Sequence, residues 1–107
     1  MAHILIVEDE KVIRSALRRL LERNEYQVDE APTLTEAQEK DLDSYDLIIS
    51  DLRLPGGNGT ELIEQAKVTP VLIMTSFASL RSAVDAMKLG AVDYIAKPFD
   101  HDEMIIA

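Results

Sequence analysis

Four apolar runs limit how this chain can fold, and polar side chains follow each run directly. HILIV precedes Glu8 and Asp9, DLIIS precedes Asp51, PVLIM precedes Thr75, and AVDYIA precedes Lys97. Apolar runs of this length, separated by helical patterns, are typical of the buried strands of a parallel sheet. The carboxyl ends of such strands share one edge, where open α/β sheets bind their ligands. We therefore expect these side chains to meet at one edge of a sheet.

Three acids, one hydroxyl and one ammonium at such an edge indicate a metal-assisted phosphoryl site. Converging carboxylates raise one another's pKa unless a cation lies between them, and Mg²⁺ binds a few carboxylates while it bridges to phosphate oxygens. On this hypothesis Glu8, Asp9 and Asp51 hold Mg²⁺, and Asp51 is the nucleophile. Thr75 donates to a phosphoryl oxygen, and Lys97 pairs with Asp51 and then with the added phosphoryl group.

Each of these residues has a plainer interpretation when it is taken alone. An Asp after a strand is most often a turn or cap residue, and most lysines are solvated surface residues. Tyr94 lies three residues before Lys97, and an edge-strand aromatic explains it about as well as a functional role does. The convergence of several residues, rather than any single one, favours the phosphoryl site.

Composition narrows the class of protein. The 107 residues suffice for one rather small domain, and the 47% apolar content is ordinary for a folded chain. The net charge of −9 argues against binding of nucleic acid or anionic membranes by this domain. The absence of cysteine excludes a disulfide scaffold and fits a reducing cytosol. No leader sequence or membrane-length apolar stretch is present, so we expect a cytoplasmic domain without a membrane partner.

Strand and helix patterns alternate along the chain. Strands are predicted over residues 3–8, 26–31, 47–50, 70–74 and 92–96, and helices over 11–23, about 33–41, about 59–67 and 79–89. Either Thr33 or Thr35 can cap the second helix, Ser79 can cap the fourth, and Gly90 lies where a C-terminal cap belongs. This alternation predicts a doubly wound parallel sheet with right-handed crossovers.

The first and last helices carry two further expectations. The stripe of the first helix that is predicted to face the sheet consists of Val12, Ile13, Ala16, Leu17, Leu20 and Leu21. The opposite face is assigned to Arg14, Arg18, Arg19 and Glu22. The last helix starts at Asp100 or Asp102 and keeps barely one turn, so residues 1–107 are predicted to be one domain of a longer chain.

Phosphate-binding loops of nucleotide enzymes are absent from the sequence. Three acids from Glu8 to Glu10 follow the first strand, where they would repel the pyrophosphate that a G-x-G-x-x-G loop binds. The glycines between Pro55 and Gly59 follow the third strand, but no Lys-Ser/Thr pair comes after them. We interpret that stretch as a flexible loop of turn formers.

Four segments resemble the receiver domain of bacterial two-component response regulators: ILIVEDE, LIISDLRLPGGNG, PVLIMTSFAS and GAVDYIAKPF. They occur in the family's order and spacing, and together they span nearly the whole chain. The resemblance implies a flavodoxin-like sheet of five parallel strands in the order 2-1-3-4-5. SLRSAVDAMKLGAVDYIAKPF is most similar to receivers of nitrogen-regulator-type (sigma-54-dependent) transcription activators, which carry an ATPase domain and a DNA-binding helix-turn-helix downstream.

The resemblance implies a role for each residue of the phosphoryl site. Asp51 is the phosphoacceptor and receives its phosphoryl group from a sensor histidine kinase, in line and with Mg²⁺. Asp9 is the more direct metal ligand, Glu8 acts more through water, and the backbone carbonyl of Arg53 supplies another ligand. The family more often has Asp at the position of Glu8 but tolerates Glu.

The resemblance also implies a conformational switch. Thr75 is the switch hydroxyl, Lys97 the phosphate partner, and Tyr94 the aromatic that changes rotamer on activation. The bond between Lys97 and Pro98 is expected to be cis. The added phosphoryl charge of about −2 draws Thr75 and Lys97 inward. The face formed by the fourth helix, fifth strand and fifth helix then changes, and it is the expected homodimer surface.

Two rival functions differ in class. A haloacid-dehalogenase-like phosphatase also uses an aspartyl nucleophile and Mg²⁺, but it needs a second acid two residues later, where this chain has Arg53. A degenerate receiver that only binds partners would lack an acid or the lysine, and this chain has them all. We therefore expect a phosphorylated signalling domain that assists its own phosphoryl transfer and dephosphorylation, and not a substrate-turnover enzyme.

Overall fold

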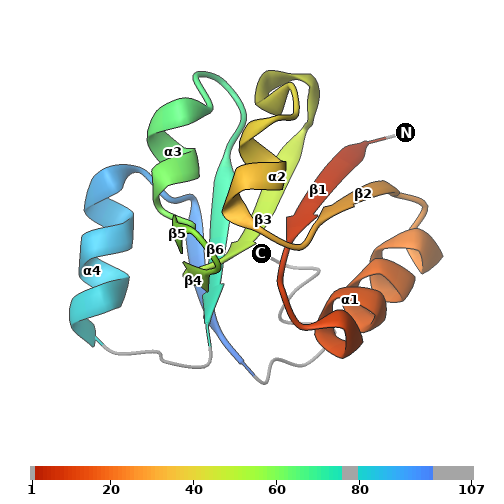
Figure 1. Cartoon of the computed structure of the whole chain (residues 1–107), viewed down its shortest axis with the longest axis horizontal. Helices are drawn as coiled ribbons and strands as arrows, with labels where there is room; N and C mark the ends of the chain where they lie inside the picture. Colours follow the sequence, from red (N-terminus) through yellow and green to blue (C-terminus); the bar gives the residue numbers. More distant parts are fainter. Residues whose placement is uncertain (1, 76–79, 98–107) are drawn as a thin grey trace.

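A parallel sheet with helices on both faces forms the fold, which the computed structural model describes for residues 2–75 and 80–97. The strands of this sheet are β1 (His3–Val7), β2 (Gln27–Ala31), β3 (Leu47–Asp51), β6 (Val71–Thr75) and β7 (Asp93–Ala96). They lie in the order β2-β1-β3-β6-β7, and every neighbouring pair is parallel (Figure 1). Counted within this sheet, the order is 2-1-3-4-5, so the prediction of a doubly wound, flavodoxin-like sheet is confirmed.

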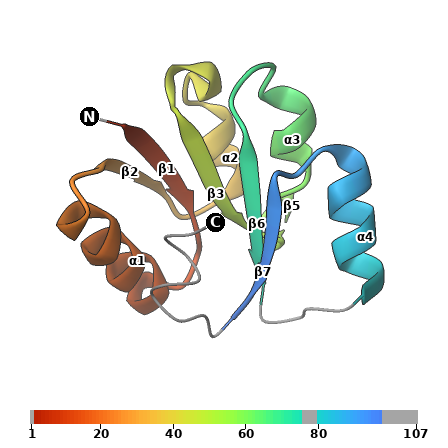
Figure 2. The same cartoon turned by 180° about the vertical axis from the view of Figure 1, so that it is seen from behind.

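Both faces of the sheet are buried, which is why its central strands are continuous apolar runs and do not alternate. The helices are α1 (Lys11–Arg23), α2 (Leu34–Gln38), α3 (Glu61–Gln65) and α4 (Leu80–Leu89). Buried residues of α2, α3 and α4 share one core cluster with one face of the sheet, and buried residues of α1 share a second cluster with the other face. The two views in Figures 1 and 2 show α1 apart from the other three helices.

The buried residues of α1 all lie in its second half. Leu17, Leu20 and Leu21 are buried, as predicted. The predicted burial of Val12 and Ala16 is wrong, because Val12 is 81% exposed and Ala16 is also exposed. The helix begins four residues after β1 ends, so its first turn follows the carboxyl edge of the strands.

The short helices are shorter than their sequence patterns indicate. Thr33, rather than Thr35, caps α2 by accepting a hydrogen bond from the backbone N–H of Glu36. A 3₁₀ helix (Leu42–Ser44) follows and turns the chain toward β3. The segment predicted to be a flexible loop forms instead a hairpin of two short strands, β4 (Arg53–Leu54) and β5 (Gly57–Asn58).

The end of α4 agrees with the sequence. Gly90 has a φ of 110°, and the backbone N–H of Ala91 donates to the carbonyl of Ala86, as in a glycine C-cap. The predicted Ser79 cap, the last helix and the Lys97–Pro98 bond lie outside the described residues. Within the described ranges, no helix is both long and apolar enough to cross a membrane.

Candidate functional site

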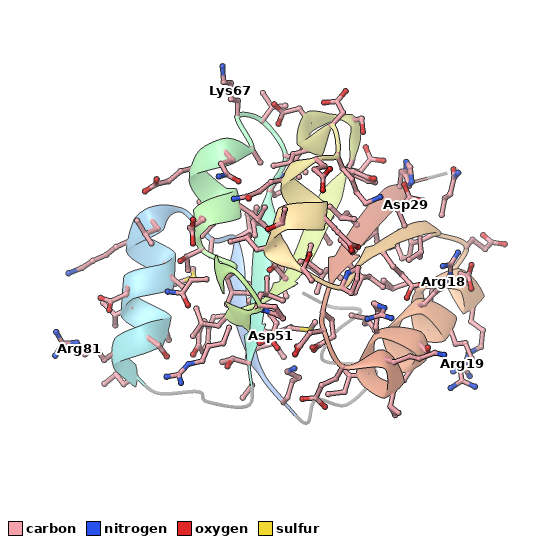
Figure 3. The ribbon with its side chains drawn as sticks, viewed as in Figure 1. Arg18, Arg19, Asp29, Asp51, Lys67 and Arg81 are labelled. Carbon is pink, nitrogen blue, oxygen red and sulfur yellow. The ribbon has the colours of Figure 1, made fainter. Side chains whose placement is uncertain are left out.

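The strand order brings the predicted site residues to one edge of the sheet. Glu8 and Asp9 follow β1, Asp51 ends β3, and Thr75 ends β6. The ladder continues one step past β7, because the backbone N–H of Lys97 donates to the carbonyl of Thr75 at 2.8 Å. Figure 3 shows Asp51 at this edge, at the opposite end of the sheet from Lys67, which precedes β6.

Three carboxylates converge closely enough to hold one cation. One oxygen each of Glu8, Asp9 and Asp51 lies within 4.8 Å of the others. Glu8 is fully buried, Asp51 is 7% exposed, and Asp9 is exposed. A carboxylate-only set of this size matches the oxygen ligands that hard divalent cations prefer. The exposed Asp9 gives such a cation access from solvent.

Lys97 is the cation that contacts the buried acids. Its Nζ lies 2.5 Å from Oε1 of Glu8 and 3.1 Å from Oδ2 of Asp51, and its side chain is only 5% exposed. The contact with Asp51 agrees with the sequence prediction. The shorter contact with Glu8 was not predicted. Among the described residues, three carboxylates and one ammonium form this cluster, so it has more negative than positive charge.

The pKa values of the pair reflect this imbalance. Burial raises the pKa of Glu8, and the nearby charge of Asp51 adds to the rise, although Lys97 and the backbone N–H of Glu10 oppose it. Burial alone would lower the pKa of Lys97, but its hydrogen bonds to Glu8 and Asp51 outweigh burial and raise that pKa. Lys97 therefore stays charged, while a further cation would favour ionised Glu8.

A close backbone contact fixes the main chain of Asp51. The Oγ of Ser50 donates to the carbonyl of Asp51 at 2.9 Å, and Gly59 N–H donates to the carbonyl of Leu52 at 2.8 Å. A Cβ added to Gly59 would lie 2.1 Å from the carbonyl oxygen of Asp51, so this position accepts only glycine without a backbone shift. Gly59 therefore has a specific packing role that the flexible-loop interpretation did not give it.

The switch residues lie on the α4 side of the sheet. Thr75 is fully buried, and Tyr94 is half-buried against the same core cluster as α4. The Tyr94 hydroxyl lies 2.5 Å from Oγ of Ser82 in α4, a contact that no sequence pattern predicted. Arg53 lies in β4 with an exposed side chain, and its carbonyl as a metal ligand stays a prediction.

A second charged cluster supports the strand end that carries Glu8. Arg14 donates from Nε to Glu30 and from Nη1 to the backbone carbonyl of Glu8, both at 2.8 Å. Arg18 also donates to Glu30. The assignment of Arg14 and Arg18 to a face directed away from the sheet is therefore wrong. Glu30 near the end of β2 could have predicted this cluster. Arg14 and Arg18 lie one turn apart on α1, so both side chains can reach one carboxylate on the strand that follows.

Fold and site together define a domain that gathers acids and a lysine at the carboxyl edge of a flavodoxin-like sheet. The family model described as the response regulator receiver domain matches residues 4–107. The transcriptional regulatory protein ResD of Bacillus subtilis is 41% identical over 107 residues, which are 96% of this chain and 45% of ResD. FixJ of Bradyrhizobium diazoefficiens is 37% identical, over 95% of this chain and 52% of FixJ.

The chain belongs to the response regulator receiver domain family of two-component systems. It spans about half the length of these curated relatives. The receiver domain of HemR from Leptospira biflexa has a TM-score of 0.90 and 36% identity, over 99% of this chain and 90% of that one. A beryllofluoride-activated NtrC4 receiver domain dimer has a TM-score of 0.91 and 33% identity, over 99% and 92%. The resemblance to nitrogen-regulator-type receivers is therefore confirmed.

Proposed function

We propose that Asp51 is the phosphoacceptor of this receiver and that a sensor histidine kinase is the donor. The observation that carries the proposal is the convergence of Glu8, Asp9 and Asp51 around the buried ammonium of Lys97. An Asp51 carboxylate oxygen attacks phosphorus, the bond from phosphorus to the donor breaks, and the donor leaves with its electron pair. The fixed main chain of Asp51 keeps this oxygen in place for in-line attack.

The metal in this proposal is Mg²⁺. Glu8, Asp9, Asp51 and the carbonyl of Arg53 would hold it, and when bound it would neutralise charge on the phosphoryl oxygens. The acid set supports a hard divalent cation, and the choice of Mg²⁺ belongs to the proposal. In a related solved structure, a response regulator protein from Burkholderia pseudomallei, a phosphorylated aspartic acid is accompanied by a calcium ion.

Phosphorylation then acts as a switch. The added charge of about −2 attracts the Lys97 ammonium and the Thr75 hydroxyl. Tyr94 moves into the space that Thr75 leaves, which alters the surface of α4 and β7. The domain assists its own phosphorylation and dephosphorylation. In this proposal it is part of a longer, cytoplasmic protein whose output domains act on transcription. Lys97–Pro98 is the cis peptide of this proposal.

Intact mass after incubation with acetyl phosphate and Mg²⁺ tests the phosphoacceptor. The wild type gains one phosphoryl group, and Asp51→Asn gains none because an amide is not a nucleophile for phosphorus. Asp85→Asn, which changes an exposed acid of α4, is the matched control and labels like the wild type. Equal labelling of wild type and Asp51→Asn removes Asp51 from this role.

We further propose that activation promotes a homodimer through the face of α4 and β7, together with the last helix that the sequence predicts. The exposed apolar residues Leu80, Val84 and Met87 recur along one side of α4, at 84%, 41% and 49% exposure. Arg81, Asp85 and Lys88 add both signs of charge to the same helix, as suits a self-complementary C₂ contact.

Sedimentation velocity with and without beryllofluoride, which mimics the phosphoryl group, tests this surface. The mimic shifts the wild type toward dimer, and Val84→Asp abolishes that shift because a charge in an apolar contact is not solvated. Val12→Asp, an equally drastic change on the exposed first turn of α1, is the control and leaves the shift intact. Association that is the same with and without the mimic contradicts the proposal.

A further inference from the structure

A hydroxyl pair connects the proposed switch tyrosine to α4. The Tyr94 hydroxyl and the Ser82 Oγ lie 2.5 Å apart, and both side chains are half-buried. Ser82 is in the first turn of α4 and Tyr94 is in β7, so the bond joins two elements that lie side by side in both ribbon views (Figures 1 and 2). A hydroxyl can donate once and accept twice, so Ser82 can keep this bond together with another.

Tyr94 and Thr75 share the face of the sheet that α4 covers. Tyr94 is the register partner of Ile73 in β6, and Ile73 packs in the same cluster as Ala86 of α4. Thr75 follows Ile73 by two residues, so alternation along β6 puts both side chains on that face. The ring of Tyr94 is therefore next to the strand that ends in Thr75, while its hydroxyl is held on α4.

A change of rotamer at Tyr94 breaks the bond to Ser82. Rotation about χ1 moves a phenol between discrete wells, and the hydroxyl at the end of the ring moves furthest. A hydrogen bond does not survive such a displacement unless the helix follows the ring. The bond therefore stabilises the present rotamer of Tyr94 together with the present place of the first turn of α4.

We propose that Ser82 is a positioning residue that holds Tyr94 on α4 in the unphosphorylated state and so limits how much of the domain is switched without phosphate. The inference rests on the proposed function, because it needs phosphorylation at Asp51 to move Tyr94. One net hydrogen bond corresponds to roughly a fivefold change in the ratio of two states. Loss of the Ser82 hydroxyl therefore raises the ratio of switched to unswitched domain by roughly fivefold.

NMR of ring-labelled tyrosine in the full chain measures this ratio. The chain has three tyrosines, and Tyr94→Phe identifies the Tyr94 signals. In wild type, beryllofluoride moves these signals from an unswitched to a switched position. In Ser82→Ala without the mimic, they shift part of the way toward the switched position, and Ser82→Thr, which keeps a hydroxyl, restores the wild-type position. Ser15→Ala, which removes a serine hydroxyl from α1, leaves the Tyr94 signals in place.

Acetyl phosphate labelling, run on the same samples, separates the two proposals. No labelling of Asp51 in the wild type overturns the proposed function. Normal labelling together with Tyr94 signals in Ser82→Ala that stay at the wild-type position, or move away from the switched one, overturns the role of Ser82. A shift that Ser82→Thr fails to reverse also overturns it, because the hydroxyl is then not the cause.

Discussion

Two neighbouring clusters of charged side chains differ in their balance of charge. On the outer strand, Glu30 is matched by Arg14 and Arg18. Next to it, Glu8, Asp9 and Asp51 converge, and among the described residues Lys97 is the one cation in contact with them, through Glu8 and Asp51. Both clusters lie where strands of one sheet meet its carboxyl edge. The number of cations at each acid, rather than the fold, therefore separates a structural cluster from a candidate site.

The pKa values of Glu30 and Glu8 are shifted in opposite directions in the two clusters. Burial raises the pKa of Glu30, but the hydrogen bonds from Arg18 and Arg14 outweigh burial and lower it overall. Burial likewise raises the pKa of Glu8, and there the single lysine does not compensate for it. Because a raised carboxyl pKa penalises the ionised form, the second cluster gains when a further cation binds, whereas the first does not.

The balanced cluster also supports the unbalanced one. Arg14 contacts both Glu30 and the backbone carbonyl of Glu8, so the guanidinium that pairs with Glu30 of β2 also holds the end of β1. An exposed ion pair alone adds little stability. Arg14 contributes more, because its guanidinium also fixes the end of a strand.

Removal of the Lys97 ammonium has the largest expected effect. Lys97→Met leaves Glu8 and Asp51 buried without their cation, and breaking such a pair costs about 3 kcal/mol of unfolding free energy. Urea unfolding measures the loss. Mg²⁺ recovers part of it, because a divalent cation replaces the missing charge.

The exposed lysine of α4 provides the control for that change. Lys88→Met removes an equal charge at the surface and changes the unfolding free energy by less than about 0.5 kcal/mol. If Mg²⁺ stabilises Lys97→Met no more than it stabilises the wild type, the lysine and the metal do not serve the same carboxylates.

The second-largest expected effect is the stabilisation of the folded wild type by Mg²⁺. A cation that binds only the folded state adds about 2.7 kcal/mol at 100 times its Kd, and the melting temperature rises accordingly. Asp9→Asn loses the dependence on Mg²⁺, because one of the three converging carboxylates becomes neutral. Glu30→Gln keeps it. A Mg²⁺-dependent rise that persists in Asp9→Asn means that the cation binds elsewhere.

The sequence predicted the unbalanced cluster better than the balanced one. Asp51 and Lys97 follow apolar runs, and strand ends in a parallel sheet have few places to lie, so their convergence followed from the pattern alone. The pairing of Arg14 with Glu30 depends on where α1 crosses β2, which a helical period does not specify. For the same reason the helical period wrongly predicted that Val12 is buried, whereas its side chain is exposed in the structure.

Side-chain contacts of single atoms were beyond the sequence. The bond between Ser82 and Tyr94 requires a particular rotamer and a particular separation of α4 from β7. The steric need for Gly59 depends on how the hairpin after β3 folds back on the carbonyl of Asp51. Both are consequences of tertiary packing, and local propensity carries no information about them.

Glu30 gives a smaller effect with a defined dependence on pH. Its folded pKa is lowered, so its stabilisation is present above its unfolded pKa, near 4.5, and is lost as the pH falls through the folded pKa. Glu30→Gln therefore lowers the unfolding free energy by about 1.5 kcal/mol at pH 7. The difference from wild type shrinks in acid below pH 4.5, as urea unfolding at several pH values measures. A difference that stays constant down to pH 2 shows that the charge of Glu30 is not what stabilises the fold.

The smallest expected effect concerns the exposed ion pair between Arg18 and Glu22 on α1. Arg18 also bonds Glu22 one turn later at 3.3 Å, and the two side chains are 39% and 48% exposed. The Arg precedes the Glu, which is the weaker orientation on a helix, so the pair adds about 0.3 kcal/mol or less. Glu22→Gln should then hardly change the urea midpoint, and 0.5 M NaCl should remove what change there is, because salt screens exposed pairs. The loss in Glu30→Gln should persist better in salt, since that carboxylate is half-buried and bonded to two guanidinium groups. Equal salt sensitivity of the two variants would remove the distinction between the surface and the balanced cluster.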